Sequence, residues 1–232
     1  MRTMRTMRGT DKPGVTAVVG RTGDVLSRLL LAALLLLAGS GRARGAVGCD
    51  LNDPDRDVAR LFPGSTGYKT TYEAIDKRGG EPLLRKVEAR LGDRFRGLYE
   101  TIDVPYTIYE IYDGKKRIGY IHGVNQKGEF GGLQVFVALD LEGKIRSFYI
   151  QKMTSQWAKK LRAPGFGRQF VGMALSDFES YDPVAAKGAG RVGDIGNPAP
   201  EAEVDFRAAM RALKKNLILM DEFVYSRQRG NR

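Results

Sequence analysis

The chain has 232 residues, 42% of them hydrophobic and 28% charged, which excludes a disordered composition and allows a core of ordinary size. Its single cysteine excludes intramolecular disulfides and cysteine-based metal sites, and one histidine argues against a zinc cluster. The net charge is +11, but residues 1–49 hold eight basic and two acidic residues, so +6 of it lies there. The remaining charges are mixed, and we expect no nucleic-acid partner.

Residues 1–49 have the layout of a secretory signal. A basic stretch leads into the apolar run Leu29–Ala38, and these ten residues are about half of the roughly 20 that a membrane-spanning helix needs. We therefore expect an exported protein, in the periplasm or on the outer face of the cytoplasmic membrane. Cleavage after Gly45 is one expectation. The segment "AVGC", ending at Cys49, resembles a bacterial lipobox, so membrane association through Cys49 lipidation, or through an uncleaved signal, stays open.

Residues 50–100 are predicted to be an N-terminal helical segment. The spacing of Val58, Leu61 and Phe62 predicts a short helix that starts near Pro54, and "PGSTGYKT" then ends it. From 82 to 96 apolar residues recur on one helical face behind a leading proline, which predicts an amphipathic helix with a basic outer side.

Residues 105–151 change from helical to alternating periodicity. Asp113-Gly114 predicts a hairpin turn after "YTIYEIY", and "LEG" predicts a second hairpin between "GLQVFVALD" and "KIRSFYIQ". Two consecutive hairpins give four antiparallel strands.

Residues 153–178 contain a predicted loop, then "RAPGFGRQF", then a short helix through Phe170. The Gly-, Ala- and Pro-rich segment 185–202 is expected to be irregular, and apolar spacing over 201–225 predicts a long amphipathic helix. The expected fold is α+β: an antiparallel four-strand meander packed with N-terminal helices and a long C-terminal helix.

Several of these motifs together resemble a known family. "LFPGST", the hairpins around "YEIYDGKK" and "VALDLEGKI", and "APGFG" followed by "FVGMALSDF" come in the order of the extracytoplasmic FMN-binding domain of the Rnf complex, the sodium-translocating NADH:quinone reductase and the nitrous-oxide-reduction regulator. The match spans roughly residues 57–225. It implies an FMN-binding-like domain over 101–225 and partners among the subunits of an envelope redox complex.

The family attaches its flavin covalently, and this chain departs from that pattern. The resemblance implies a phosphoester to a threonine in S-G-A-T-x-[ST] before the last helix. No threonine follows Thr154 here, and Gly190 stands at the acceptor position. A glycine has no hydroxyl group, so we expect no covalent flavin.

Two interpretations follow, and the sequence leaves both open. In the first, FMN binds non-covalently and the protein is an electron-transfer component rather than a substrate-turnover enzyme. Glycine would let the main chain approach the isoalloxazine, Phe166 would pack on it, and cations would hold the phosphate. In the second, the flavin is lost, the glycines form a tight turn, and the fold is an interaction or structural subunit of an envelope redox complex. The cofactor-binding candidates are Gly165, Phe166, Gly167, Lys159, Lys160, Arg162, Arg168, Lys187 and Arg191, with Tyr120, Gly131 and Gly132 added by the resemblance.

The chain contains one histidine and one tryptophan. His122, the only histidine, is interpreted as a structural residue at the sheet edge. Trp157, close to the glycine segment, either fills a gap in the core or stacks on a flavin.

Overall fold

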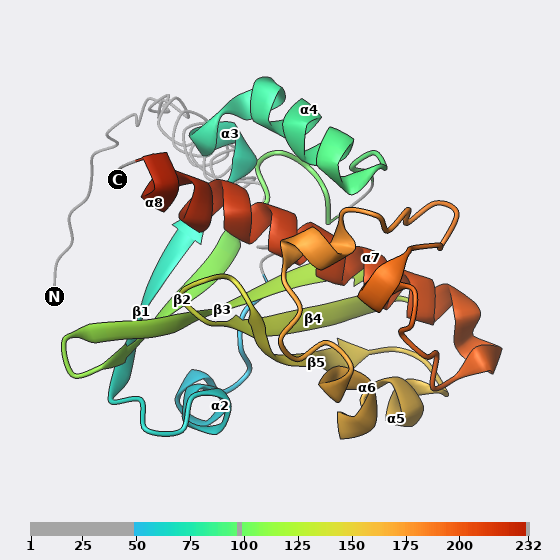
Figure 1. Ribbon diagram of the computed structural model, residues 1–232, viewed down its shortest axis with the longest axis horizontal. Coiled ribbons are helices and arrows are strands. Elements are labelled where there is room, and N and C mark those ends of the chain that lie inside the picture. Colours follow the sequence, from blue (N-terminus) through green and yellow to red (C-terminus); the bar gives the residue numbers. More distant parts are fainter. Residues whose placement is uncertain (1–48, 97–98, 231–232) are drawn as a thin grey trace, which may run out of the picture. The chain divides into compact units, whose positions relative to one another are not determined.

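A five-stranded antiparallel sheet forms the centre of the structure, a computed structural model that describes residues 49–96 and 99–230. Strand order follows the sequence, and each strand pairs with the next one (Figure 1). The predicted signal lies outside the described residues, apart from Cys49. The strands are β1 (Gly67–Glu73), β2 (Tyr106–Asp113), β3 (Lys116–Lys127), β4 (Gly132–Leu139) and β5 (Ile145–Met153).

The expected count of four strands is wrong, because β1 adds a fifth. Strands β2 to β5 are the four predicted from alternating periodicity. β1 lies in the segment expected only to end a helix, and it pairs with β2 over its whole length. As an edge strand it has no fully buried residue, and Tyr72 is 68% exposed, so its sequence lacks a clear apolar alternation. Residues 50–100 therefore contribute a strand to the sheet as well as helices.

The three helices predicted from apolar spacing are present, with differences at their ends. The prediction for residues 153–170 is wrong in part: a short helix, Ala158–Leu161, lies in the expected loop, and the helix expected after the glycines contains them and ends at Arg168. A helix begins at Pro54, another ends at Leu91 because Gly92 adopts a left-handed conformation (φ +76°), and a long one follows residue 203. The segment 185–202 contains only two short 3-10 turns, η2 (Gly190–Val192) and η3 (Pro200–Ala202). The α-helices are α2 (Pro54–Leu61), α3 (Ile75–Arg78), α4 (Gly80–Leu91), α5 (Ala158–Leu161), α6 (Pro164–Arg168), α7 (Glu203–Met220) and α8 (Ser226–Gly230), with a further 3-10 turn, η1 (Leu175–Phe178), and a π-helical turn, η4 (Asp221–Tyr225).

The sheet is covered on both faces. Alternate strand residues such as Val135 and Val137 pack with α7 in a large core, and α7 runs across that face in Figure 1. On the other face, Phe136 and Ile121 pack with Val58 of α2 in a smaller core. Among the described residues, no helix combines the length and the apolar character needed to cross a membrane.

Candidate functional site

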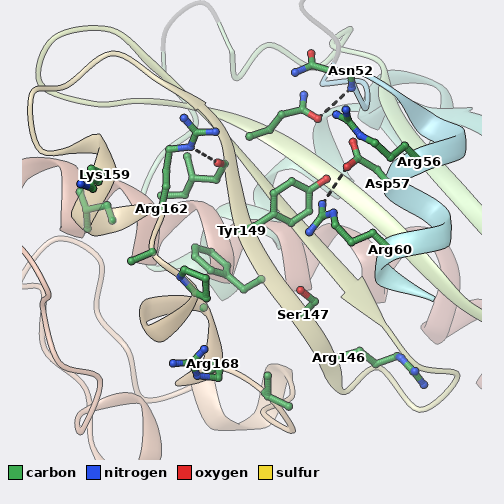
Figure 2. Close-up of a pocket in the computed structure, with 18 residues that line it drawn as sticks. Asn52, Arg56, Asp57, Arg60, Arg146, Ser147, Tyr149, Lys159, Arg162 and Arg168 are labelled. Atoms are coloured by element: carbon green, nitrogen blue, oxygen red, sulfur yellow. Dashed lines mark hydrogen bonds and ion pairs between the residues drawn. The ribbon is translucent and has the colours of Figure 1, made fainter. Parts of the chain in front are cut away.

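A groove of about 1080 Å³ follows β5, with α2 on one side and α5 and α6 on the other (Figure 2). We call it the β5 groove. Its volume is slightly above the range of about 300–1,000 Å³ that is usual for small-molecule sites. The floor is formed by β5 itself, including Ser147 and Tyr149. Because α2 and α6 are far apart in sequence, the groove exists only in the folded chain.

The β5 groove has a strong excess of positive charge. One carboxylate, Asp57, faces six cationic side chains, so the lining carries five more positive charges than negative ones. A cleft lined by charges of one sign concentrates oppositely charged ligands from solution. The cations are Arg56 and Arg60 on the α2 side, Arg146 on β5, and Lys159, Arg162 and Arg168 on the side of α5 and α6.

The α2 wall is fixed to the floor by local hydrogen bonds. Asp53 caps the helix by accepting a hydrogen bond from Arg56 N (3.2 Å), and Pro54 in the first turn has no backbone N–H that would need an acceptor. Just before the cap, Asn52 N donates to Oε1 of Gln151 on β5 (3.0 Å), and Gln151 Nε2 donates to Asp50 O (3.0 Å). These bonds set the distance between the wall and the strand.

Tyr149 lies on the floor, and its ring contacts an aromatic side chain and a cation. Its cross-strand partner Phe136 on β4 stacks with it (centroids 5.5 Å apart, 18° between planes), and the Arg60 guanidinium lies 4.7 Å from the Tyr149 ring centroid. Arg60 is held there by Asp57 at 3.0 Å. Tyr149 Oη is buried, next to the Arg60 guanidinium. Burial, with the nearby Asp57 charge, raises the Tyr149 pKa, so the hydroxyl remains a proton donor at neutral pH.

The glycine segment is a short helix, α6, with Pro164 in its first turn. A Cβ atom on Gly167 would overlap the carbonyl oxygen of Phe148 on β5, so glycine is needed where α6 touches the strand. A Cβ on Gly165 would meet only the end of Arg168, 3.7 Å away. Phe166 is 2% exposed, and its ring packs in the large core against Phe148, among other aromatic side chains. The ring therefore offers no surface to an isoalloxazine in this structure.

Part of the predicted site lies in the β5 groove. Lys159, Arg162, Gly167 and Arg168 line it, and Figure 2 shows the three cations on the wall opposite α2. Arg162 Nε donates to Ile150 O (3.0 Å), which orients its guanidinium along β5.

The other predicted residues lie elsewhere. Lys160 binds Glu201 (3.1 Å), and Tyr120 accepts a hydrogen bond from Gln228 (2.7 Å) and contacts Tyr225 on the α7 side of the sheet. The remaining members also fall outside the groove lining: Gly131 in the β3–β4 connection near Thr154, Gly132 at the first position of β4 near Tyr99, Lys187 in a backbone bridge with Asp182, and Arg191 on the carbonyls of Val171 and Gly172.

The α2 side of the groove was not predicted from the sequence. Arg56 and Arg60 are four residues apart, and helical periodicity does put them on one face. Nothing in that spacing shows that the face meets β5, because this depends on Asn52 binding Gln151. Arg146 was not predicted either, because its strand was recognised only from the alternation of apolar residues.

His122 and Trp157 have structural surroundings. His122 lies on the central strand β3, so its expected place at the sheet edge is wrong. It is fully buried, and its Nδ1 lies 2.8 Å from Asn216 Oδ1. Burial lowers its pKa to about 4. Trp157 is partly buried against the large core, and the Lys160 ammonium lies 4.8 Å from its ring centroid.

Neither metal-ligand chemistry nor comparison with known proteins assigns a function to the β5 groove. Within residues 49–96 and 99–230, no group of His, Cys, Asp and Glu side chains could hold a metal ion. Searches of known protein families and of curated proteins find no model and no sequence that matches the chain.

Proposed function

We propose that this protein is exported, binds FMN non-covalently, and acts as an electron-transfer accessory component in the cell envelope. The observation that carries the proposal is the excess of five positive charges in the β5 groove, where the FMN phosphate would lie. The flavin identity and the envelope partners come from the resemblance of the sequence motifs.

The α5–α6 wall has the chemistry that a phosphate needs. Arg162 and Arg168 can each donate two parallel hydrogen bonds to phosphate oxygens, and Lys159 adds a compact charge. Neither Lys159 nor Arg168 forms an ion pair with any described residue, so both are available to a ligand. When bound, the flavin supplies the electron transfer, while the chain positions it and sets its surroundings.

A covalent bond is not part of this proposal, because Gly190 has no nucleophile and no threonine follows Thr154. Yellow colour that stays with the polypeptide after denaturation and precipitation would contradict it.

The second candidate is a flavin-free interaction or structural subunit of an envelope redox complex. One observation favours it: the glycine segment is explained by packing alone, since Gly167 meets Phe148 and Phe166 is part of the core. In that case the β5 groove binds an acidic partner or nothing.

Titration of the purified full chain with FMN separates the two candidates. We expect saturable quenching of flavin fluorescence, and riboflavin, which lacks the phosphate, should bind at least about tenfold more weakly. Arg162→Gln with Arg168→Gln should weaken FMN binding by about tenfold or more. Lys187→Gln is the matched control, because Lys187 is a sequence-predicted cation outside the groove lining. No quenching at tens of micromolar FMN would favour the flavin-free function.

A further inference from the structure

The two edges of the central sheet are covered differently. At the β5 edge, Ile145 N donates to Met173 O (2.8 Å) and Gly172 N donates to Ile145 O (2.7 Å). Farther along β5, Arg162 Nε donates to Ile150 O (3.0 Å). At the other edge (Figure 1), the main chain of β1 hydrogen-bonds with β2, and no other described residue bonds to it. The outer N–H and C=O groups of β1 can therefore pair with another strand.

β1 also lacks the features that keep an edge strand single. It pairs with β2 in one continuous register over seven residues, and it contains neither a bulge nor a proline. Tyrosine and threonine, which favour strands, make up four of these residues. Tyr72 is the most exposed of the large hydrophobic side chains in the described ranges, at 68%. A regular, uncovered strand of this kind is a template for pairing with another chain.

The sequence of β1 is complementary to a second copy of itself. In an antiparallel pair centred on Thr71, residues 69–73 of the two strands lie opposite one another. Thr71 lies opposite its own copy, and Thr70 lies opposite Tyr72 of the second copy. Thr–Thr pairs and pairs of an aromatic with a β-branched residue are among those that stabilise antiparallel strands. The Thr70–Tyr72 pair forms twice, because the arrangement is two-fold symmetric.

The charges of β1 fit the same register. Lys69 lies directly opposite Glu73 of the second copy, and this pair also forms twice. A parallel pair in register would instead put Lys69 beside Lys69 and Glu73 beside Glu73. Glu73 accepts two hydrogen bonds from Arg78 in its own chain, so the second cation fixes the orientation and adds little affinity.

We propose that β1 pairs antiparallel with β1 of a second copy, centred on Thr71, so that two five-stranded sheets join into one continuous sheet. Contact along one short strand covers less than the roughly 1,200 Å² at which standard interfaces begin, so we expect a reversible dimer with a dissociation constant on the order of micromolar. The two β5 grooves lie at the outer edges of the joined sheet, since β5 is the strand farthest from β1. Dimer formation therefore leaves FMN binding unaffected and is independent of the proposed function.

Sedimentation velocity of the full chain over a range of concentrations tests the dimer. The average mass should rise from one chain toward two as the concentration passes through the micromolar range. Tyr72→Glu removes both Thr70–Tyr72 pairs and should weaken dimerisation by about tenfold. Val184→Glu is the matched control, because Val184 is 64% exposed and lies outside β1. Both variants should unfold at the wild-type urea midpoint, because both side chains are exposed.

Disulfide trapping tests the register. In a Cys49→Ala background, Thr71→Cys puts two thiols on directly opposite residues, whose Cα atoms would lie about 4.5 to 5.5 Å apart, within disulfide range. Mild oxidation should link this variant into a covalent dimer within minutes. Lys69→Cys is the control, since the two copies of residue 69 would lie about 14 Å apart along the strand pair.

Three results would overturn the β1 dimer. The first is a full chain that stays monomeric at about 200 μM, well above the expected dissociation constant. The second is association that Tyr72→Glu leaves unchanged, because contacts outside β1 would then hold the copies together. The third is equal cross-linking of the two cysteine variants, which would show random collision instead of a fixed register.

Discussion

Lys215 and Glu100 form a buried ion pair, with Nζ 2.7 Å from Oε1. Lys215 is fully buried, and the Glu100 side chain is 5% exposed. Lys215 also donates to Asn125 O on β3 (2.8 Å), and Arg211 donates to the same carboxylate. Burial by itself would raise the Glu100 pKa, but the charges of Lys215 and Arg211 outweigh it and lower the pKa. The pair ties α7 to the segment before β2 and to the sheet.

Removing one charge of this pair should destabilise the protein strongly. Glu100→Gln leaves the Lys215 ammonium buried without its anion, so the free energy of unfolding in urea should fall by about 3 to 5 kcal/mol. Glu203→Gln is the control, since its pair with Arg207 is exposed and should contribute at most about 1 kcal/mol. Similar losses in both variants would show that the buried pair has no special role.

The two glycines of α6 should respond differently to alanine. Gly167→Ala forces a methyl group onto the Phe148 carbonyl and should cost about 1 to 3 kcal/mol of stability. The methyl group of Gly165→Ala would meet only the end of the Arg168 side chain. This substitution in a helix should therefore be neutral or stabilising by about 0.5 to 1 kcal/mol. Urea unfolding of both variants measures this. If Gly167→Ala keeps full stability but loses FMN binding, the glycine serves a ligand instead of the packing.

The sequence predicted most of the fold because its signals are local. Each of these signals depends only on residues that are close in sequence: the Asp113-Gly114 turn, the apolar alternation of β2 to β5 and the apolar stripe of α7. β1 was missed because an exposed edge strand has no buried face to impose alternation, and its pairing with β2 joins residues about 40 positions apart.

The site could be predicted only in part, for the same physical reason. Lys159, Arg162 and Arg168 are close in sequence and were found together. Arg56 and Arg60 reach the groove through the contact of Asn52 with Gln151, a long-range hydrogen bond that no motif encodes. Phe166 was expected to face a ligand, but a phenylalanine beside two glycines has the same sequence pattern whether it packs inward or outward.

The Cys49 thiol should be unreactive while the protein is folded. Cys49 is 3% exposed in the smaller core, and burial, followed by the Asp50 charge, raises its pKa, so little thiolate forms. A thiol reagent added to the full chain should react within minutes only after urea unfolding. A lipid on Sγ requires Cys49 to leave this core, so a purified chain that carries diacylglycerol at Cys49 should lack the Leu51 N to Tyr109 Oη hydrogen bond. Rapid labelling of folded, unlipidated protein would contradict the burial.

His122 should make the protein less stable in mild acid. Its pKa falls from 6.5 to about 4 because burial disfavours the imidazolium, and the Lys215 charge adds to this while the Asn216 hydrogen bond opposes it. Between these two pH values the unfolded chain binds more protons than the folded one, so stability is fully present above about pH 6.5 and is lost as the pH falls toward 4. The loss from this group should approach about 3 kcal/mol. Urea unfolding of the wild type and of His122→Gln from pH 7 to pH 4 separates the contribution of His122 from that of the carboxylates that titrate in the same pH range. The stability advantage of the wild type should shrink steadily over that range, and an advantage that stays constant with pH would show that His122 does not titrate as a buried neutral group.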